Sequence, residues 1–237
     1  MKILYLIPAR KGSKGLPGKN TKLLGDKPLI EYSIDFALDN LQIDDELCIS
    51  TNDEAVIAIA KSKGISIPFI RPEELSNDNA SSHDVIIHAI NQYEKLNQTF
   101  DAVLLLQPTS PYRHQNDFTN LIKEYSVEID MVVSVKLAKE NPYFTLFEQN
   151  NEGFLSKSKL GEFERRQDCP EVYAFNGSMY LINIESIKKS RITAFKNIKK
   201  VIMPEERSVD IDTLADWILA EFYLKNENSK NYTEIRY

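Results

Sequence analysis

The sequence predicts an α/β fold in which helices cover a parallel or mixed sheet. Over the N-terminal two thirds of the 237 residues, short apolar runs alternate with segments of helical periodicity. The first run, residues 3–7, is apolar throughout, as a strand buried on both faces should be. A hydrophobic content of 42% supports one compact core, and we expect residues 1–237 to form a single domain.

The elements follow in order along the chain. Helix 29–41 has an apolar stripe behind Pro28, which suits the first turn of a helix. Residues 51–54 and 81–84 have capping-box spacing, so each is expected to open a helix. A further helix is expected at 117–125. The remaining core segments are expected as strands at 47–50, 65–69, 102–106, 131–135, 178–182 and 199–203.

The pattern changes after about residue 137. Residues 137–175 are polar, charged and aromatic, with a turn at 150–153, so we expect a lobe that protrudes from the sheet. The last helix is expected from about Thr213. Its predicted inward-facing residues are Leu214, Trp217, Ile218 and Phe222.

Composition and residue spacing argue against several classes of protein. No apolar run approaches the roughly 20 residues of a membrane helix, and no signal peptide is recognisable, so we expect a cytoplasmic protein without a membrane partner. A net charge of −6 argues against a nucleic-acid partner. Cys48 and Cys169 are expected to be reduced, and the three histidines lack the spacing of a zinc site.

Residues 8–20 form a basic, glycine-rich loop directly after the first strand. The chain carries five cations and no acid between Ile7 and Asp26, although the protein as a whole is acidic. Glycines at 12, 15 and 18 let backbone N–H groups approach an anion. Neither the P-loop nor the dinucleotide pattern is present, so a phosphate-binding loop of another kind is indicated. The alternative interpretation is a solvated basic loop.

Two carboxylates near the carboxyl terminus form a second group. In an extended segment, Asp210 and Asp212 project to the same face and can share a hard cation such as Mg²⁺. The alternative is that Asp212 caps the last helix.

Two further polar groups lie elsewhere in the chain. Residues 107–111 follow a buried strand, where a rigid sheet can position side chains for a ligand. Arg165 and Arg166, in the lobe, could bind a carboxylate or phosphate, although a solvated charge run is the more common meaning of such a pair.

Together these residues resemble the acylneuraminate cytidylyltransferases, also called CMP-sialic acid synthetases. The matching blocks appear in order at residues 7–20, 71–75, 80–82, 106–111, 165–168, 176–177 and 208–212. The resemblance implies a Rossmann-like nucleotidyltransferase fold, a three-layer sandwich with a mixed, mostly parallel sheet. It also implies a homodimer in which the protruding segment reaches the partner's active site, and a reaction of CTP with a 2-keto nonulosonic acid that gives the CMP-sugar and pyrophosphate with Mg²⁺.

The resemblance also implies a role for individual residues. Arg10 and Lys19 would hold the triphosphate, with Ser13 and Asn20 beside them, and Arg71 and Ser82 would place the cytidine. Gln107 would contact the acidic nine-carbon sugar, Arg166 would serve at the catalytic centre, and Asp210 and Asp212 would bind the metal. The residues single out no general base.

Two other functions are compatible with the same motifs. One is a nucleotidyltransferase for 3-deoxy-octulosonate or for a sugar 1-phosphate. The other is a non-catalytic nucleotide-binding module. Which nine-carbon acid an enzyme of this kind would use depends on a few pocket residues.

Overall fold

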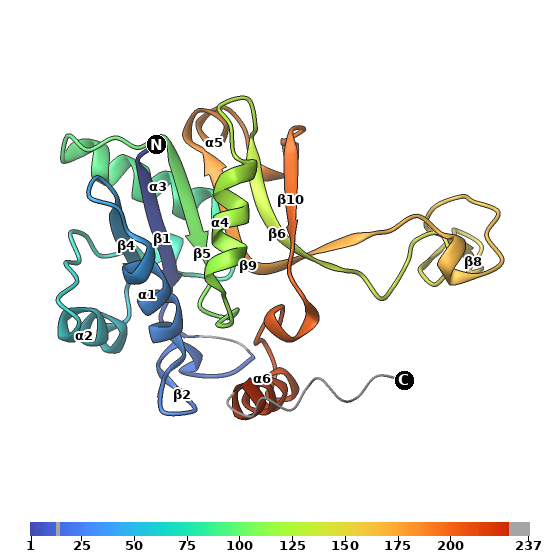
Figure 1. Ribbon diagram of the computed structural model, residues 1–237, viewed down its shortest axis with the longest axis horizontal. Coiled ribbons are helices and arrows are strands. Elements are labelled where there is room, and N and C mark those ends of the chain that lie inside the picture. The colour runs from blue at the N-terminus through green and yellow to red at the C-terminus, as the bar shows by residue number, and fades with distance from the viewer. Residues whose placement is uncertain (13–14, 228–237) are drawn as a thin grey trace.

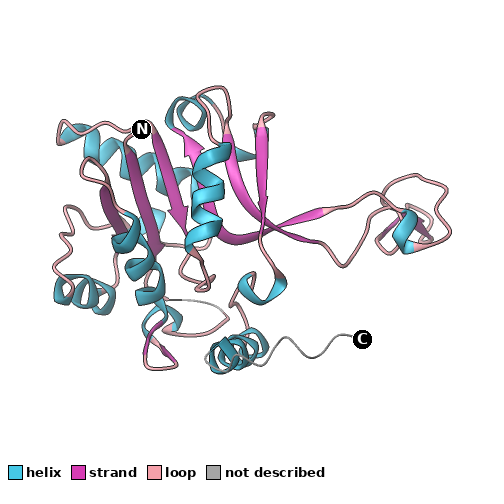
Figure 2. Cartoon of the chain, viewed as in Figure 1, coloured by secondary structure: helices cyan, strands magenta, loops and turns pink. Residues whose placement is uncertain are grey.

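The computed structural model describes residues 1–12 and 15–227, and its centre is a six-stranded sheet between two layers of helices (Figures 1 and 2). The strand order is β10-β6-β9-β5-β1-β4. The six strands are β1 (Ile3–Ala9), β4 (Glu46–Thr51), β5 (Ala102–Leu106), β6 (Met131–Leu137), β9 (Tyr173–Asn183) and β10 (Ile198–Ile202). β9 is antiparallel to both its neighbours and the other paired strands are parallel, which confirms the mixed, mostly parallel sheet.

Both faces of the sheet are buried because side chains alternate along each strand. Tyr5 and Ile7 of β1 belong to the core cluster that includes residues of α1 (Leu29–Asn40), α2 (Glu54–Ser62) and α4 (Gln115–Glu124). Leu4 and Leu6 belong to the cluster on the other face, with α3 (Ser82–Lys95) and α5 (Ile184–Lys189). Each fully buried side chain of this size contributes about 1.5–3 kcal/mol, so β1 anchors the carboxyl-end loop that follows it.

A third core cluster lies at the carboxyl end of β1 and β5. It joins the hairpin of β2 (Leu23–Leu24) and β3 (Lys27–Pro28) to α6 (Leu214–Glu227). Its buried residues are Leu24, Leu29, Tyr112, Val209, Ile211, Trp217 and Ala220. Short 3-10 helices complete the chain at η1 (Lys19–Thr21), η2 (Glu73–Leu75), η3 (Arg166–Asp168), η4 (Ile192–Ala194) and η5 (Glu205–Arg207).

The ends of β6 and β9 leave the sheet together as a two-stranded ribbon. β6 and β9 remain paired as far as Leu137 and Tyr173, and the chain beyond them extends away from the sheet (Figure 1). This lobe, residues 138–172, carries a small hairpin of β7 (Phe147–Gln149) and β8 (Leu155–Lys157).

Two local predictions were wrong. Residues 65–69 form no strand; Pro68 lacks the N–H that a ladder needs, and Ile65 and Ile67 instead pack in the core cluster that includes α2. The N-cap of α2 is Asp53, which accepts a hydrogen bond from the Ala55 amide at 3.0 Å. Thr51, which the capping-box spacing favoured, is still paired in β4.

The predicted inner face of the last helix was also largely wrong. Trp217 is buried, whereas the other three side chains are exposed: Leu214 at 59%, Ile218 at 60% and Phe222 at 52%. The reason is that α6 lies beyond the end of the sheet instead of across its face (Figure 1), so only a narrow side of it contacts the core.

Both cysteines are free, as predicted. Cys48 is buried in β4, and burial raises the pKa of its thiol to about 12. Within residues 1–12 and 15–227, no helix combines the length and apolar character that crossing a membrane requires.

Candidate nucleotide and metal site

Two adjoining cavities open at the carboxyl ends of β1 and β5, where open α/β sheets bind ligands. The larger has a volume of about 430 Å³ and the smaller about 210 Å³, and Pro8 and Arg10 line both. The larger cavity is lined by Pro8, Arg10, Gly12, Gly15, Lys19, Asn20, Gln107, Pro108, Thr109 and Asp212. The basic loop, the end of β5 and the segment before α6 therefore border one space.

The glycine-rich loop and the carboxyl-terminal aspartates meet by close backbone packing. A Cβ placed on Gly15 would lie 2.1 Å from the carbonyl oxygen of Asp212, so only glycine fits this position. Ser13, expected beside the triphosphate, lies outside the described residues.

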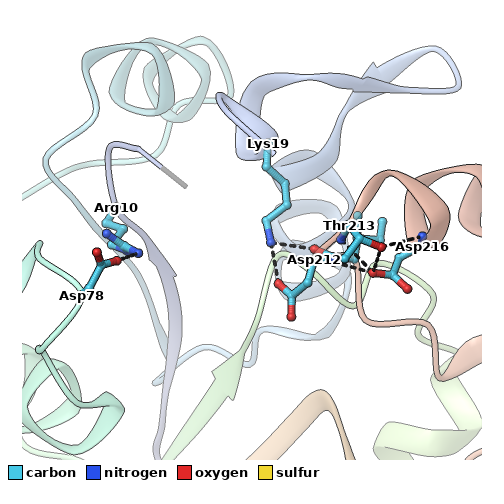
Figure 3. A network of polar contacts seen from close by, with 7 residues as sticks. Arg10, Lys19, Asp78, Asp212, Thr213 and Asp216 are labelled. Atoms are coloured by element: carbon cyan, nitrogen blue, oxygen red, sulfur yellow. Dashed lines mark hydrogen bonds and ion pairs between the residues drawn. The ribbon is translucent and has the colours of Figure 1, made fainter. Parts of the chain in front are cut away.

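Lys19 connects the two ends of the chain most directly. Its side chain is buried, and Nζ donates to the carbonyl of Ile211 at 2.6 Å and to Oδ1 of Asp212 at 2.9 Å (Figure 3). The ammonium therefore faces the cavity from a fixed position while one of the two predicted metal ligands neutralises it.

Arg10 lies on the other side of the cavity from Lys19 in Figure 3 and is also paired with a carboxylate. Its NH2 group donates to Oδ1 of Asp78 at 2.6 Å, and its backbone carbonyl lies 3.5 Å from Nδ2 of Asn20. The sequence reasoning missed Asp78, because an acid in a polar loop carries no signal of its own.

The smaller cavity contains the two residues expected to place the base. Arg71 is 4% exposed, donates to the Ser50 carbonyl at 2.6 Å, and has no partner for Nε among the residues described. Burial and, to a smaller extent, the nearby Arg10 lower its pKa to about 10. Ser82, the first residue of α3, also lines this cavity. Arg71 and Ser82 thus bring a guanidinium and a hydroxyl to the lining of one cavity, which suits recognition of a polar ring.

Asp210 and the side chain of Gln107 both lie against Gly177 in β9. Gly177 has a φ of +75°, and a Cβ there would lie 2.9 Å from Oε1 of Gln107 and 3.3 Å from Oδ2 of Asp210. Asp210 is open to solvent, but the surrounding protein desolvates its carboxylate enough to raise its pKa, and the negative charge of Asp212 adds to that rise.

The donor set fits Mg²⁺. Mg²⁺ binds through one or two carboxylates and completes its octahedral shell with waters and substrate phosphates. The negative charge of Asp212, two residues along the chain, contributes to the raised pKa of Asp210. In the described part of the chain no group of three or more His, Cys, Asp or Glu residues could hold a metal, so these two would need phosphate oxygens to complete the shell.

The alternative role of Asp212 as a helix cap is wrong. The side chain that caps α6 belongs to Thr213, whose Oγ1 accepts from the Asp216 amide at 3.3 Å. Asp216 in turn accepts from the Thr213 amide at 2.7 Å, and its Oδ2 also accepts from the Asp212 amide at 3.1 Å. The Asp212 carboxylate is thereby left to face Lys19.

Two predicted residues of the described chain line neither cavity: Asp210, which lies against Gly177, and Arg166. Arg166 belongs to η3 in the lobe, is exposed, and lines neither cavity (Figure 1). Its neighbour Arg165 is paired with Asp168 at 2.8 Å. One chain by itself does not bring Arg166 to the site.

The buried side-chain amide of Asn176 holds the segment that contains Asp210 and Asp212. The sequence by itself indicated no individual role for this residue. Asn176 is 2% exposed; its Oδ1 accepts from Ser134 Oγ at 2.7 Å and its Nδ2 donates to Ser208 Oγ at 3.0 Å. Ser208 precedes Asp210 by two residues, and the Ile211 amide donates to the Thr109 carbonyl at 2.8 Å. These bonds fix the two carboxylates against β6, β9 and the end of β5.

Known proteins resemble this chain over nearly its whole length. The chain is 34% identical over 224 residues to CMP-N,N'-diacetyllegionaminic acid synthase of Legionella pneumophila, covering 93% of this chain and 95% of that protein. It is 31% identical to pseudaminic acid cytidylyltransferase of Campylobacter jejuni, covering 95% and 97%. It is 35% identical to N-acylneuraminate cytidylyltransferase of Streptococcus agalactiae, covering 92% of this chain and 52% of that protein.

Solved structures agree on the fold. CMP:2-keto-3-deoxy-manno-octonic acid synthetase, solved with CTP, superimposes with a TM-score of 0.69 at 18% identity, covering 96% of this chain and 100% of that one. 4-diphosphocytidyl-2C-methyl-D-erythritol synthase from Anaerococcus prevotii superimposes with a TM-score of 0.59 at 14% identity, covering 94% and 99%. The cytidylyltransferase family model matches residues 4–223, from β1 through most of α6. The chain belongs to the cytidylyltransferase family and is a nucleotidyltransferase.

Proposed function

We propose that the protein transfers the cytidylyl group of CTP to a 2-keto nonulosonic acid, giving the CMP-sugar and pyrophosphate. The observation that carries the proposal is the meeting of Lys19 with Asp212 at the edge of one cavity, because it joins a phosphate-binding cation to a metal-binding carboxylate. The names of the legionaminic, pseudaminic and acylneuraminic relatives support the acidic nine-carbon acceptor.

The two cavities suggest how CTP binds. The triphosphate would occupy the larger cavity between Arg10 and Lys19, with Asn20 beside it, and the cytidine would enter the smaller cavity beside Arg71 and Ser82. Both cations already carry carboxylate partners, Asp78 and Asp212. Phosphate oxygens would replace these partners, so that bound CTP releases Asp212 for Mg²⁺.

The chemistry requires positioning above all. The anomeric 2-hydroxyl of the sugar would attack the α-phosphorus in line as the bond to pyrophosphate breaks, and Arg10 and Lys19 would stabilise the charge that develops on the departing group. Mg²⁺, held by Asp210 and Asp212, would offset part of that charge. Gln107 and Asp210 both lie against Gly177, and the Gln107 amide would hydrogen-bond the incoming sugar.

The remaining predicted residue, Arg166, would come from a second copy of the chain. The lobe exposes a set of large apolar side chains that a partner could cover: Phe147 at 46%, Phe154 at 67%, Leu155 at 70% and Leu160 at 92%. Arg166 does not reach the cavity of its own chain. A homodimer in which each lobe crosses to the other subunit would bring Arg166 to the partner's cavity.

Complementation tests this shared site. Arg166→Ala and Asp210→Asn homodimers are each expected to be nearly inactive. After the two are mixed and allowed to exchange subunits, about half of the dimers are mixed, and each mixed dimer holds one intact site, so activity should return to about a quarter of the wild-type value. The control is each variant exchanged with itself. Absence of recovery, with exchange verified by mass spectrometry, would show that Arg166 acts within its own chain or not at all.

The substrate itself is tested by a panel. Purified protein with CTP and Mg²⁺ is expected to release pyrophosphate with N-acetylneuraminic, legionaminic or pseudaminic acid. The panel includes 3-deoxy-octulosonate and sugar 1-phosphates, which would identify the rival transferases. Calorimetric CTP binding without product from any acceptor would instead indicate a non-catalytic nucleotide-binding module.

A further inference from the structure

A half-buried guanidinium lies next to the candidate site, outside every role given so far. Arg113 follows the polar segment at the end of β5 and precedes α4 by two residues. Its NH2 donates to the Gln107 carbonyl at 2.7 Å, and NH2 and Nε donate to the Ser178 carbonyl at 3.0 and 3.1 Å. Its NH1 donates to Ser33 Oγ in α1 at 2.9 Å. One side chain thereby joins β5, β9 and α1.

The two carbonyls that Arg113 bridges occupy a particular place in the sheet. The antiparallel ladder between β5 and β9 ends at the pair Leu106 and Met179. The next residues in that register are Gln107 and Ser178, the two whose carbonyls the guanidinium joins. Arg113 therefore continues the connection between the strands by one residue beyond the last ladder pair.

This arrangement is not one that stability alone would favour. The partners of Arg113 are two backbone carbonyls, a hydroxyl and the ring of Phe36, whose centre lies 5.7 Å from Cζ, and no ion pair to a carboxylate is found for it among the described residues. Burial lowers the pKa of the guanidinium to about 9, which reflects the cost of keeping a charge there. Keeping a partly buried cation without a counter-ion costs free energy, so the bonds that Arg113 makes to the two strand-end carbonyls point to a role in positioning them.

The contacts of Arg113 with the two strand ends affect where Gln107 lies relative to Asp210. Gln107 carries the amide expected to contact the sugar, and Ser178 follows Gly177, the residue that lies against both the Gln107 side chain and Asp210. A shift between the ends of β5 and β9 would move Gln107 relative to Asp210. A displacement of about 1 Å at a reacting group can cost about 100-fold in rate.

We propose that Arg113 is a positioning residue that holds Gln107 in register with Gly177 and Asp210 for binding of the acidic sugar. The identity of the sugar in this inference rests on the proposed function. The ends of the two strands are locked by the forked geometry of the guanidinium, which can reach both carbonyls at once, whereas a lysine ammonium is a single point of charge.

The test compares Arg113→Met and Arg113→Lys with Ser33→Ala. Ser33→Ala removes the bond to α1 but keeps both carbonyl bonds, so it controls for a general loss of stability. We expect both Arg113 variants to raise the KM for the acid that works in the panel about tenfold or more, with the dissociation constant for CTP within about twofold of wild type. Ser33→Ala should leave both constants within about twofold.

A second measurement needs no substrate. Hydrogen exchange of the peptide covering residues 107–112 should accelerate in both Arg113 variants and remain near wild type in Ser33→Ala, because the Ser110 amide donates to the Gln107 carbonyl. Unchanged exchange in folded Arg113→Met would overturn the positioning role whatever the substrate is. Full rescue of the sugar KM by Arg113→Lys would also overturn it, since charge alone would then suffice. If wild type turns over no acid in the panel, the proposed function fails and the exchange result alone decides the inference.

Discussion

Replacing Lys19 with alanine is expected to weaken CTP binding by about 100-fold or more. The ammonium of Lys19 is held at the edge of the cavity by the Ile211 carbonyl and Asp212, so its position is fixed before phosphate replaces the Asp212 carboxylate. Hydrogen bonds between charged groups are the strong ones, and loss of a preorganised donor at a developing charge typically costs about 2.7–4 kcal/mol. Calorimetric titration of CTP measures the effect on binding, and steady-state kinetics measures the effect on turnover.

Lys22→Ala is the matched control for this variant. Lys22 belongs to the same basic segment, but its Nζ lies 4.7 Å from the centre of the Trp217 ring and it does not line the larger cavity. The Lys22→Ala variant also removes one positive charge, three residues further along the chain, so its CTP affinity should change by only a few fold. Equal losses in the two variants would mean that the loop acts by general charge, and an unchanged affinity in Lys19→Ala would exclude a triphosphate role for that residue.

Replacing Asp210 with asparagine is expected to reduce turnover by about 100-fold or more and to raise the Mg²⁺ concentration needed for half-maximal activity. The substitution keeps the shape of the side chain and removes its charge. Asp212→Asn should act in the same direction. It also removes the ion pair to Lys19, so CTP affinity without Mg²⁺ should not fall and can rise, because phosphate no longer competes with that carboxylate.

Asp216→Asn separates metal binding from helix capping. Asp216 accepts hydrogen bonds at the start of α6, so its replacement should lower thermal stability by about 1 kcal/mol and leave the Mg²⁺ dependence unchanged. Melting temperatures and Mg²⁺ titrations are measured on all three variants. A fall in melting temperature for Asp210→Asn as large as that for Asp216→Asn, together with a normal Mg²⁺ titration, would contradict a metal-binding role.

Sequence periodicity was a reliable guide where one face or both faces of an element are buried. The apolar run of β1 is buried as predicted, and so are Ile30, Ile34 and Ala37 on the predicted stripe of α1, although Leu38 of that stripe is 42% exposed. Prediction from periodicity failed where the burial of a helix depends on its place in the fold. Ile218 and Phe222 fall on a helical apolar stripe, but α6 lies beyond the end of the sheet, so this stripe remains exposed.

The site shows the same division. The excess of cations in residues 8–20 and the spacing of Asp210 and Asp212 predicted the chemistry of each group from the chain alone. The tertiary structure supplied the contacts that spacing cannot encode, such as Asp78 with Arg10 and Arg113 with the strand-end carbonyls. Each of these joins residues whose types are common in loops, so no local pattern distinguishes them from solvated charges.

The sequence by itself determined the alternation of strands and helices and the kinds of ligand that its polar groups suit, because periodicity and side-chain chemistry are local properties. Only the tertiary structure decided that Lys19 and Asp212, 193 residues apart, lie 2.9 Å from each other at one cavity, and that Arg166 does not reach it within the same chain. The physical reason is that the ends of strands meet through the order of the sheet, which is set by the packing of both faces at once and by no single segment.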